Sequence, residues 1–202
     1  MGLEARCTAR FGKQSSAGLA RLEEKELHFR GSFRLKIPLA AMKSAEAKRG
    51  VLTVRWPEGM AAFDLGAQAE KWALKIRYPR SRMEKLGVKP GLRVAVLGVE
   101  DRPFWRELDD AGVAASEKPG KDCDLIFFGI DDAAPLKRLG ELQKHLQPAG
   151  AIWVVWPKGQ PHIKEDHVRA AALAVGLVDV KVCAFSETLS ALKLMIPRAN
   201  RK

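Results

Sequence analysis

Two apolar stretches decide the fold of this chain: Cys123-Asp-Leu-Ile-Phe-Phe-Gly129 and Pro148-Ala-Gly-Ala-Ile-Trp-Val-Val-Trp-Pro-Lys158. Each is an apolar run of the kind that a sheet buries on both faces. A helix is expected between them, because Pro135 suits a first helical turn and leucines follow it at helical spacing. Strands joined by a helix run parallel, so the pattern predicts an α/β layer. Such layers usually bind a nucleotide-like cofactor at the carboxyl ends of their strands.

The rest of residues 86–198 extends this pattern. We expect further strands at 92–98, 112–116, 178–185 and 191–196, and helices around Phe104 and Val168. Only Ser186-Glu-Thr-Leu-Ser190 joins the last two strands, and this joint is too short for a crossover helix. The predicted fold class is therefore α/β, with a reduced Rossmann-like, mostly parallel sheet that ends in an antiparallel hairpin.

The first part of the chain has shorter apolar runs separated by turn residues, including a turn predicted at 12–16. Strands are predicted at 5–11, 18–22, 27–29, 33–37, 51–56 and 60–65. Ala69, Trp72, Ala73 and Ile76 then form a helical stripe, which Pro79 ends. We expect a small antiparallel β domain with one C-terminal helix at 1–78, a basic linker at 79–85, the α/β domain at 86–198 and a frayed tail at 199–202.

Charge is distributed unevenly between these parts. Residues 1–82 hold 17 Lys and Arg against 8 Asp and Glu, a net +9, whereas residues 83–202 hold 18 against 16, a net +2. A polyanion or protein partner is therefore expected to meet the N-terminal domain. The basic candidates for polyanion binding are Arg30, Arg34, Lys36, Lys48 and Arg49.

The sequence also predicts where the protein works. No apolar run approaches the ~20 residues that span a bilayer, and the N-terminus lacks the apolar core of a secretion signal. Cys7, Cys123 and Cys183 stand singly, at spacings that fit neither a disulfide framework nor a zinc site. We therefore expect a cytoplasmic protein with no membrane span, no metal and free thiols.

The C-terminal pattern resembles the back half of a class I methyltransferase. The matching segments are Asp124-Leu-Ile-Phe-Phe, Leu146-Gln-Pro-Ala-Gly-Ala-Ile-Trp-Val-Val, Gly176-Leu-Val-Asp-Val-Lys-Val and Ala191-Leu-Lys-Leu-Met-Ile-Pro-Arg. More closely, residues 83–198 resemble a bacterial domain-of-unknown-function family whose members look like trimmed methyltransferases. The features are Leu86-Gly-Val-Lys-Pro-Gly-Leu-Arg-Val, Trp153-Val-Val-Trp-Pro-Lys and Ser190-Ala-Leu-Lys-Leu. Residues 3–78 are similar in pattern to pleckstrin-homology-like domains.

The methyltransferase resemblance implies a cofactor, S-adenosylmethionine, held by a loop with several glycines after the first strand. The corresponding segment here is Leu97-Gly-Val-Glu-Asp-Arg-Pro103, in which only Gly98 remains. The resemblance makes Gly98, Glu117 and Asp131 the candidate cofactor contacts. The usual next helix and strand are missing, because only Lys118-Pro-Gly-Lys-Asp122 separates Glu117 from the following strand.

These departures predict a non-catalytic binding or scaffold module whose methyltransferase-like half has lost its cofactor chemistry. Bulky and acidic side chains stand where the backbone must approach a nucleoside, so no cofactor is expected. The first alternative is a small-molecule methyltransferase using S-adenosylmethionine, with Glu100 or Asp101 as base. The second is a nucleic-acid-associated protein that works through its basic domain.

Other chemistry-bearing residues have structural explanations. His162 and His167 are five residues apart, a poor spacing for one helix face. We therefore expect both to face solvent rather than to bind a metal. Asp131 and Asp132 follow the third strand, where a general base is possible but capping the next helix is the expected role. Trp153 and Trp156 should face opposite sides of their strand, one in the core and one near the site beside Lys158.

Overall fold

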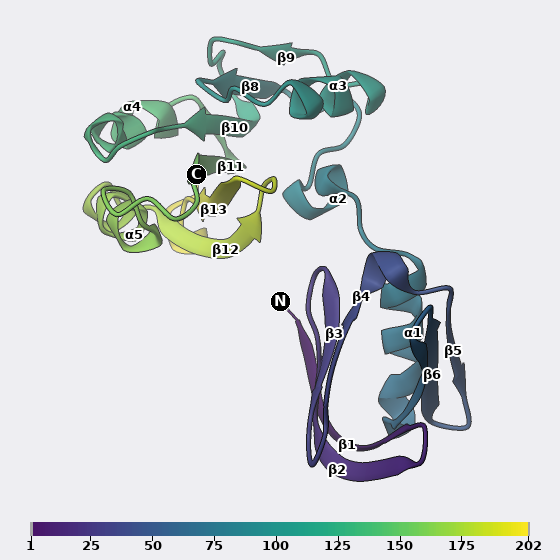
Figure 1. The fold of residues 1–202 in the computed structure, drawn as a ribbon. Helices are drawn as coiled ribbons and strands as arrows, with labels where there is room; N and C mark the ends of the chain where they lie inside the picture. Colours follow the sequence, from purple (N-terminus) through teal and green to yellow (C-terminus); the bar gives the residue numbers. More distant parts are fainter. Residues whose placement is uncertain (1, 202) are drawn as a thin grey trace. The chain divides into compact units, whose positions relative to one another are not determined.

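The computed structural model describes residues 2–201, which form two compact units that divide between Arg80 and Ser81 (Figure 1). The first unit is a seven-stranded antiparallel sheet with strand order β4-β3-β2-β1-β7-β6-β5. Its strands are β1 (Leu3–Phe11), β2 (Gln14–Leu22), β3 (Glu26–Arg30), β4 (Arg34–Pro38), β5 (Ser44–Lys48), β6 (Val51–Trp56) and β7 (Gly59–Asp64). Short 3-10 turns η1 (Leu39–Ala41) and η2 (Gly66–Gln68) connect elements of this unit.

The helix α1 (Ala69–Arg77) closes the first unit, running beside β5 and β6 in Figure 1. It buries Ala69, Trp72 and Ala73 in the core made by the inward residues of the sheet, and Ile76 packs at the core's edge. The stripe predicted at helical spacing is thus the face that packs on the sheet. Alternation along the strands sends the remaining side chains outward, so the sheet has one apolar and one polar face.

Two predictions for the first unit are wrong. The turn expected at 12–16 is only Gly12 and Lys13, because Gly12 adopts a positive φ of 58° and Ser15 and Ser16 already pair with β1. A tight two-residue turn of this kind lets the strands start at once. The strand β5 was not predicted, because its residues are small and polar and only Ala45 is fully buried.

The second unit is a six-stranded sheet with strand order β12-β13-β11-β10-β8-β9. The strands β8 (Val94–Leu97), β9 (Ala115–Ser116), β10 (Cys123–Gly129) and β11 (Leu146–Pro157) are parallel, whereas β12 (Val178–Ala184) and β13 (Leu189–Met195) form the antiparallel end. Its helices are α2 (Arg82–Leu86), α3 (Arg102–Asp110), α4 (Leu139–Gln143) and α5 (Glu165–Ala174), with 3-10 turns η3 (Ala134–Arg138) and η4 (Arg198–Asn200). Within residues 2–201, β9 and β12 are the two edges of this sheet, and no strand lies beyond β9.

Each face of this sheet has its own core. Leucines of η3 and α4, with Val168 and Ala172 of α5, cover one face. Residues of α2 and α3, with Phe127, Trp153 and Phe185, cover the other. Trp153 and Trp156 therefore do face opposite sides, and both are buried. Trp153 donates its indole N–H to the Leu86 carbonyl oxygen at 3.0 Å, which ties β11 to α2.

The predicted linker at 79–85 is wrong from Ser81 onward. Ser81 Oγ accepts from the Glu84 backbone N–H at 3.1 Å, and a Glu84 carboxylate oxygen accepts from the Ser81 N–H at 2.7 Å. This reciprocal capping box starts α2, a part of the second unit.

The tail predicted to fray is ordered in its described part. Residues 198–200 form η4, and the Arg201 guanidinium donates to the Ile196 carbonyl at 3.0 Å. Lys202 lies outside the described residues. None of the helices described in residues 2–201 is long and apolar enough to cross a membrane.

Candidate functional site

At the carboxyl ends of the parallel strands, where a cofactor would be expected, the backbone at the predicted contact Gly98 is exposed and lies close to Gly129 of the neighbouring strand. The β8–β10 ladder ends with Leu97 opposite Phe128, and the next residue on each strand is glycine. Gly98 has a positive φ of 63°. A Cβ added to Gly129 would overlap the Gly98 carbonyl, lying 2.5 Å from its carbon and 2.9 Å from Val99 N. Both glycines are therefore required by the approach of the chain to itself.

Asp101, a candidate base, is held by the fold. One carboxylate oxygen accepts from the Phe104 N–H at 2.8 Å, which caps α3, and the other lies 3.1 Å from an Arg82 guanidinium nitrogen. The Asp101 side chain is only 10% exposed. Its oxygens are therefore committed to a helix terminus and an ion pair.

Arg82 is the centre of this cluster. Its guanidinium also donates to the Glu107 carboxylate at 2.9 Å and lies over the rings of Phe104 and Phe185, at 5.3 and 5.2 Å from their centroids. Burial lowers the pKa of Arg82, but hydrogen bonds to Glu107 and Asp101 outweigh it and raise the pKa overall. The cluster fixes α2 and the loop after β8 to the start of α3.

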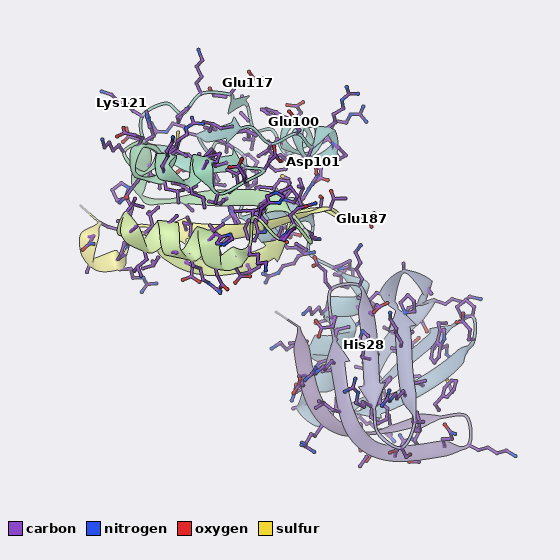
Figure 2. The ribbon with its side chains drawn as sticks, turned by 60° about the vertical axis from the view of Figure 1, so that its left-hand side comes forward. His28, Glu100, Asp101, Glu117, Lys121 and Glu187 are labelled. Atoms are coloured by element: carbon purple, nitrogen blue, oxygen red, sulfur yellow. The ribbon has the colours of Figure 1, made fainter. Side chains whose placement is uncertain are left out.

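The remaining candidate acids are exposed and separate. Glu100 lies in the loop after β8, Glu117 follows the edge strand β9 and Asp131 follows β10. Figure 2 shows Glu100, Asp101 and Glu117 toward one side of the second unit. Within the described residues no hydrogen bond or ion pair joins any two of Glu100, Glu117 and Asp131, so these acids do not form a paired-carboxylate site.

The residues after β10 are used in turns. Asp132 accepts from the Ala134 N–H at 2.8 Å in the turn before η3. The capping role expected for Asp131 and Asp132 is wrong, because the N-cap of η3 is Ala133 and no side chain caps it. His162 Nε2 lies 3.0 Å from the Asp131 carbonyl oxygen, and His167 Nδ1 lies 3.2 Å from the Lys164 backbone nitrogen. Within residues 2–201 no cluster of His, Cys, Asp or Glu could hold a metal ion.

A shallow cavity of about 470 Å³ lies past the end of β11. Of its lining residues, the sequence indicated only Trp156 and Lys158. Ile163, Glu165 and Ser190 also line it. Lys158 Nζ donates to the carbonyls of Ser186 at 2.6 Å and Glu187 at 3.2 Å. This ammonium therefore ties the β12–β13 connection to β11.

The cysteines are not arranged as nucleophiles. Burial, with a smaller effect of Asp64, raises the pKa of Cys7 to about 11, and burial raises the pKa of Cys123. All three cysteines are free thiols. Because the thiolate is the reactive form, neither Cys7 nor Cys123 has the environment of a catalytic cysteine.

A second candidate site lies on the first unit. A cavity of about 380 Å³ is lined by Arg21, His28, Arg30, Arg34 and Lys36, together with Leu19, Glu23, Phe29 and Leu35 (Figure 2 labels His28). The structure thus brings together three of the predicted basic residues, Arg30, Arg34 and Lys36. It adds Arg21, which only the strand register reveals.

Lys48 and Arg49 do not join this group. They lie at the β5–β6 turn, and β5 and β4 are opposite edges of the sheet. Arg49 adopts a positive φ of 51° there, followed by Gly50 at 80°. The five predicted basic residues are therefore divided between two places.

Comparison with known proteins gives a likeness of fold. No protein-family model and no curated protein matches the sequence. Among solved structures, a SAM-dependent methyltransferase from Aquifex aeolicus is 20% identical, covering 57% of this chain and 87% of its own, with a TM-score of 0.41. A TehB-like SAM-dependent methyltransferase from Corynebacterium glutamicum is 12% identical, covering 64% and 96%, with a TM-score of 0.44.

The first unit also has a solved counterpart. An N-terminal PH domain of a human protein is 11% identical, covering 40% of this chain and 84% of that domain, with a TM-score of 0.32. These structures match the two resemblances predicted from the sequence.

Proposed function

We propose that this protein is a non-catalytic binding module, in which the methyltransferase-like unit is a scaffold without cofactor chemistry. The observation that carries the proposal is the contact between Gly98 and Gly129 at the carboxyl ends of β8 and β10. A nucleoside needs backbone that it can approach at this position, and here the neighbouring strand makes that approach.

The acidic residues support the same proposal. A methyltransferase base must be free to reach its substrate, but Asp101 caps α3 and pairs with Arg82. Glu117 stands after a two-residue edge strand and has no wall of sheet beyond it within the described residues. The residues present therefore do not fit S-adenosylmethionine in the usual position, and no methyl-transfer step is derived from them.

Calorimetric titration of the full chain with S-adenosylmethionine, and with S-adenosylhomocysteine, tests the proposal. We expect no heat of binding for either compound up to millimolar concentration. A micromolar dissociation constant for either one, lost in Glu117→Gln or Asp131→Asn but kept in Glu141→Gln, would instead support the methyltransferase alternative. Glu141 is a suitable control because its carboxylate pairs with Lys144 on the exposed face of α4.

A further inference from the structure

The outer face of β1–β4 carries cations in register. Arg6, Leu19, Arg30 and Arg34 lie opposite one another on the four consecutive strands, and Glu4, Arg21, His28 and Lys36 form the adjacent row. Because strands lie about 4.8 Å apart, the row from Arg6 to Arg34 spans about 14 Å, and the two rows are about 7 Å apart. The inward residues of the same strands, such as Ala20 and Phe29, are buried, so this face looks to solvent.

The two rows differ in how their charges are balanced. In the second row, Arg21 pairs with Glu4 at 2.5 Å, and Glu26 lies 3.0 Å from His28 and 3.1 Å from Lys36. In the first row, no ion pair is recorded among residues 2–201 for Arg6, Arg30 or Arg34. Arg30 and Arg34 are directly opposite each other, an arrangement of like charges that destabilises a sheet. An anionic partner would relieve this repulsion.

The chemistry of the face selects among polyanions. The large apolar side chains exposed in the described chain are Met60, Leu74, Tyr78, Leu173, Val178, Val180 and Val182, and none of them is on β1–β4. Stacking of unpaired bases needs exposed aromatic rings, and insertion at a membrane surface needs apolar side chains. Phe33 does not supply an exposed aromatic ring, because it packs against Phe29 and the core.

The remaining mode of binding for this face is recognition of closely spaced phosphates without contacts to bases. We propose that the outer face of β1–β4 binds the phosphodiester backbone of double-stranded nucleic acid, with Arg6, Arg30 and Arg34 as its principal contacts. A duplex carries one charge per about 1.7 Å of its axis, dense enough to meet a row of this length at several points. This inference concerns the first unit and holds whether or not the second unit binds a cofactor.

The salt dependence of binding tests how many phosphates the face neutralises. Fluorescence anisotropy of the full chain with a labelled random-sequence duplex of about 20 base pairs is measured across about 50–200 mM salt. Three neutralised phosphates predict a slope of log K against log salt of about −3. We expect similar affinity for unrelated sequences. The absence of binding at the lowest salt concentration, or a slope near zero, would overturn the proposal.

A pair of charge-matched variants tests the location. Arg30→Gln with Arg34→Gln should make the slope shallower by about 2 and weaken binding several-fold at the lowest salt concentration. Lys71→Gln with Lys89→Gln removes the same charge from exposed positions on α1 and in the second unit, and should leave the slope unchanged. Circular dichroism confirms that both variants fold. Equal losses in the two variants would show that net charge alone drives binding, against the proposed site.

Vesicles separate nucleic acid from a lipid surface as the partner. Co-sedimentation with vesicles of phosphatidylcholine containing one third phosphatidylserine is measured at the same salt concentrations. We expect weaker binding than to the duplex, with no difference between the Arg30/Arg34 and Lys71/Lys89 variants. Tighter binding to vesicles that depends on Arg30 and Arg34 would assign the face to a membrane and refute the nucleic-acid proposal.

Discussion

The carboxyl edge of the second sheet and the outer face of the first sheet both carry charged side chains, but they use them differently. At the carboxyl edge, Asp101 caps a helix and forms a partly buried ion pair with Arg82. On the outer face, Arg30 and Arg34 are exposed and opposite each other. The comparison teaches that Asp101 and Arg82 at the edge of the second sheet have partners within the fold, whereas Arg30 and Arg34 on the first unit have no ion pair in the described chain.

The largest expected effect is at the backbone contact. Gly129→Ala should destabilise the second unit by about 3 kcal/mol, because the new methyl group would overlap the Gly98 carbonyl and β8 and β10 are central strands that cannot separate. Gly120→Ala is the matched control, since nothing lies within 4 Å of its added Cβ. Urea denaturation followed by tryptophan fluorescence measures both. A Gly129→Ala protein as stable as Gly120→Ala would mean that the strand ends have room to separate, which also removes the steric basis of the proposed function.

The next effect tests whether Arg82 is structural. Arg82→Met keeps an apolar side chain beside the rings of Phe104 and Phe185 but leaves the Asp101 carboxylate, 10% exposed, without its cation. We expect a loss of about 2 kcal/mol in the free energy of unfolding. Arg82→Lys keeps a charge without the forked geometry and should lose about half as much. If Arg82→Met unfolds at the wild-type denaturant concentration, the cluster is free for another role.

The sequence predicts most of the second sheet because its strands are long apolar runs, as in Cys123–Gly129. It predicts less where a contact joins distant residues. The helix α2 was not predicted, although Ser81-Arg-Met-Glu84 has the spacing of a capping box. The basic residues around this segment favoured a linker instead. The requirement for glycine at Gly129 is set by Gly98, about thirty residues earlier, and no local pattern reports it.

The basic face shows the same limit. Arg34 and Lys36 are two residues apart on β4 and share its exposed side, as alternation along a strand requires. Arg6 and Arg21 were not included, because their places depend on how β1 and β2 pair with each other and with β3. Lys48 and Arg49 were close in sequence to this group but are separated from it by the order of the strands.

A smaller effect is expected at Lys193, where the second unit also leaves like charges together. Lys193 lies opposite Lys181 across the β12–β13 pair, with its ammonium 6.0 Å from the Trp153 ring centroid. Burial, and then the charges of Lys181 and Arg201, lower the pKa of Lys193. Lys193→Met should therefore stabilise the protein by about 0.5 kcal/mol at neutral pH.

The pH dependence of that difference gives a sharper test. Because the folded pKa of Lys193 lies below its unfolded value of 10.5, the unfolded chain binds more protons between the two values, and wild-type stability gains from Lys193 as pH rises through this window. The advantage of Lys193→Met should shrink over the same range. Taking the difference between variant and wild type removes the opposite contribution of Cys7, whose raised pKa of about 11 costs stability above pH 9. A constant difference from pH 7 to 10.5 would exclude a shifted ammonium as its cause.

The smallest expected effect is on the outer face of the first sheet. Arg30→Gln with Arg34→Gln should change the free energy of unfolding by no more than about 0.5 kcal/mol, and in the stabilising direction, because these exposed side chains have no recorded ion pair in the described chain and repel each other. Thermal unfolding at low and high salt measures this, and the small gain should fade at high salt as the repulsion is screened. A loss of 2 kcal/mol would place these arginines in the same structural class as Arg82, and the contrast between the two regions would disappear.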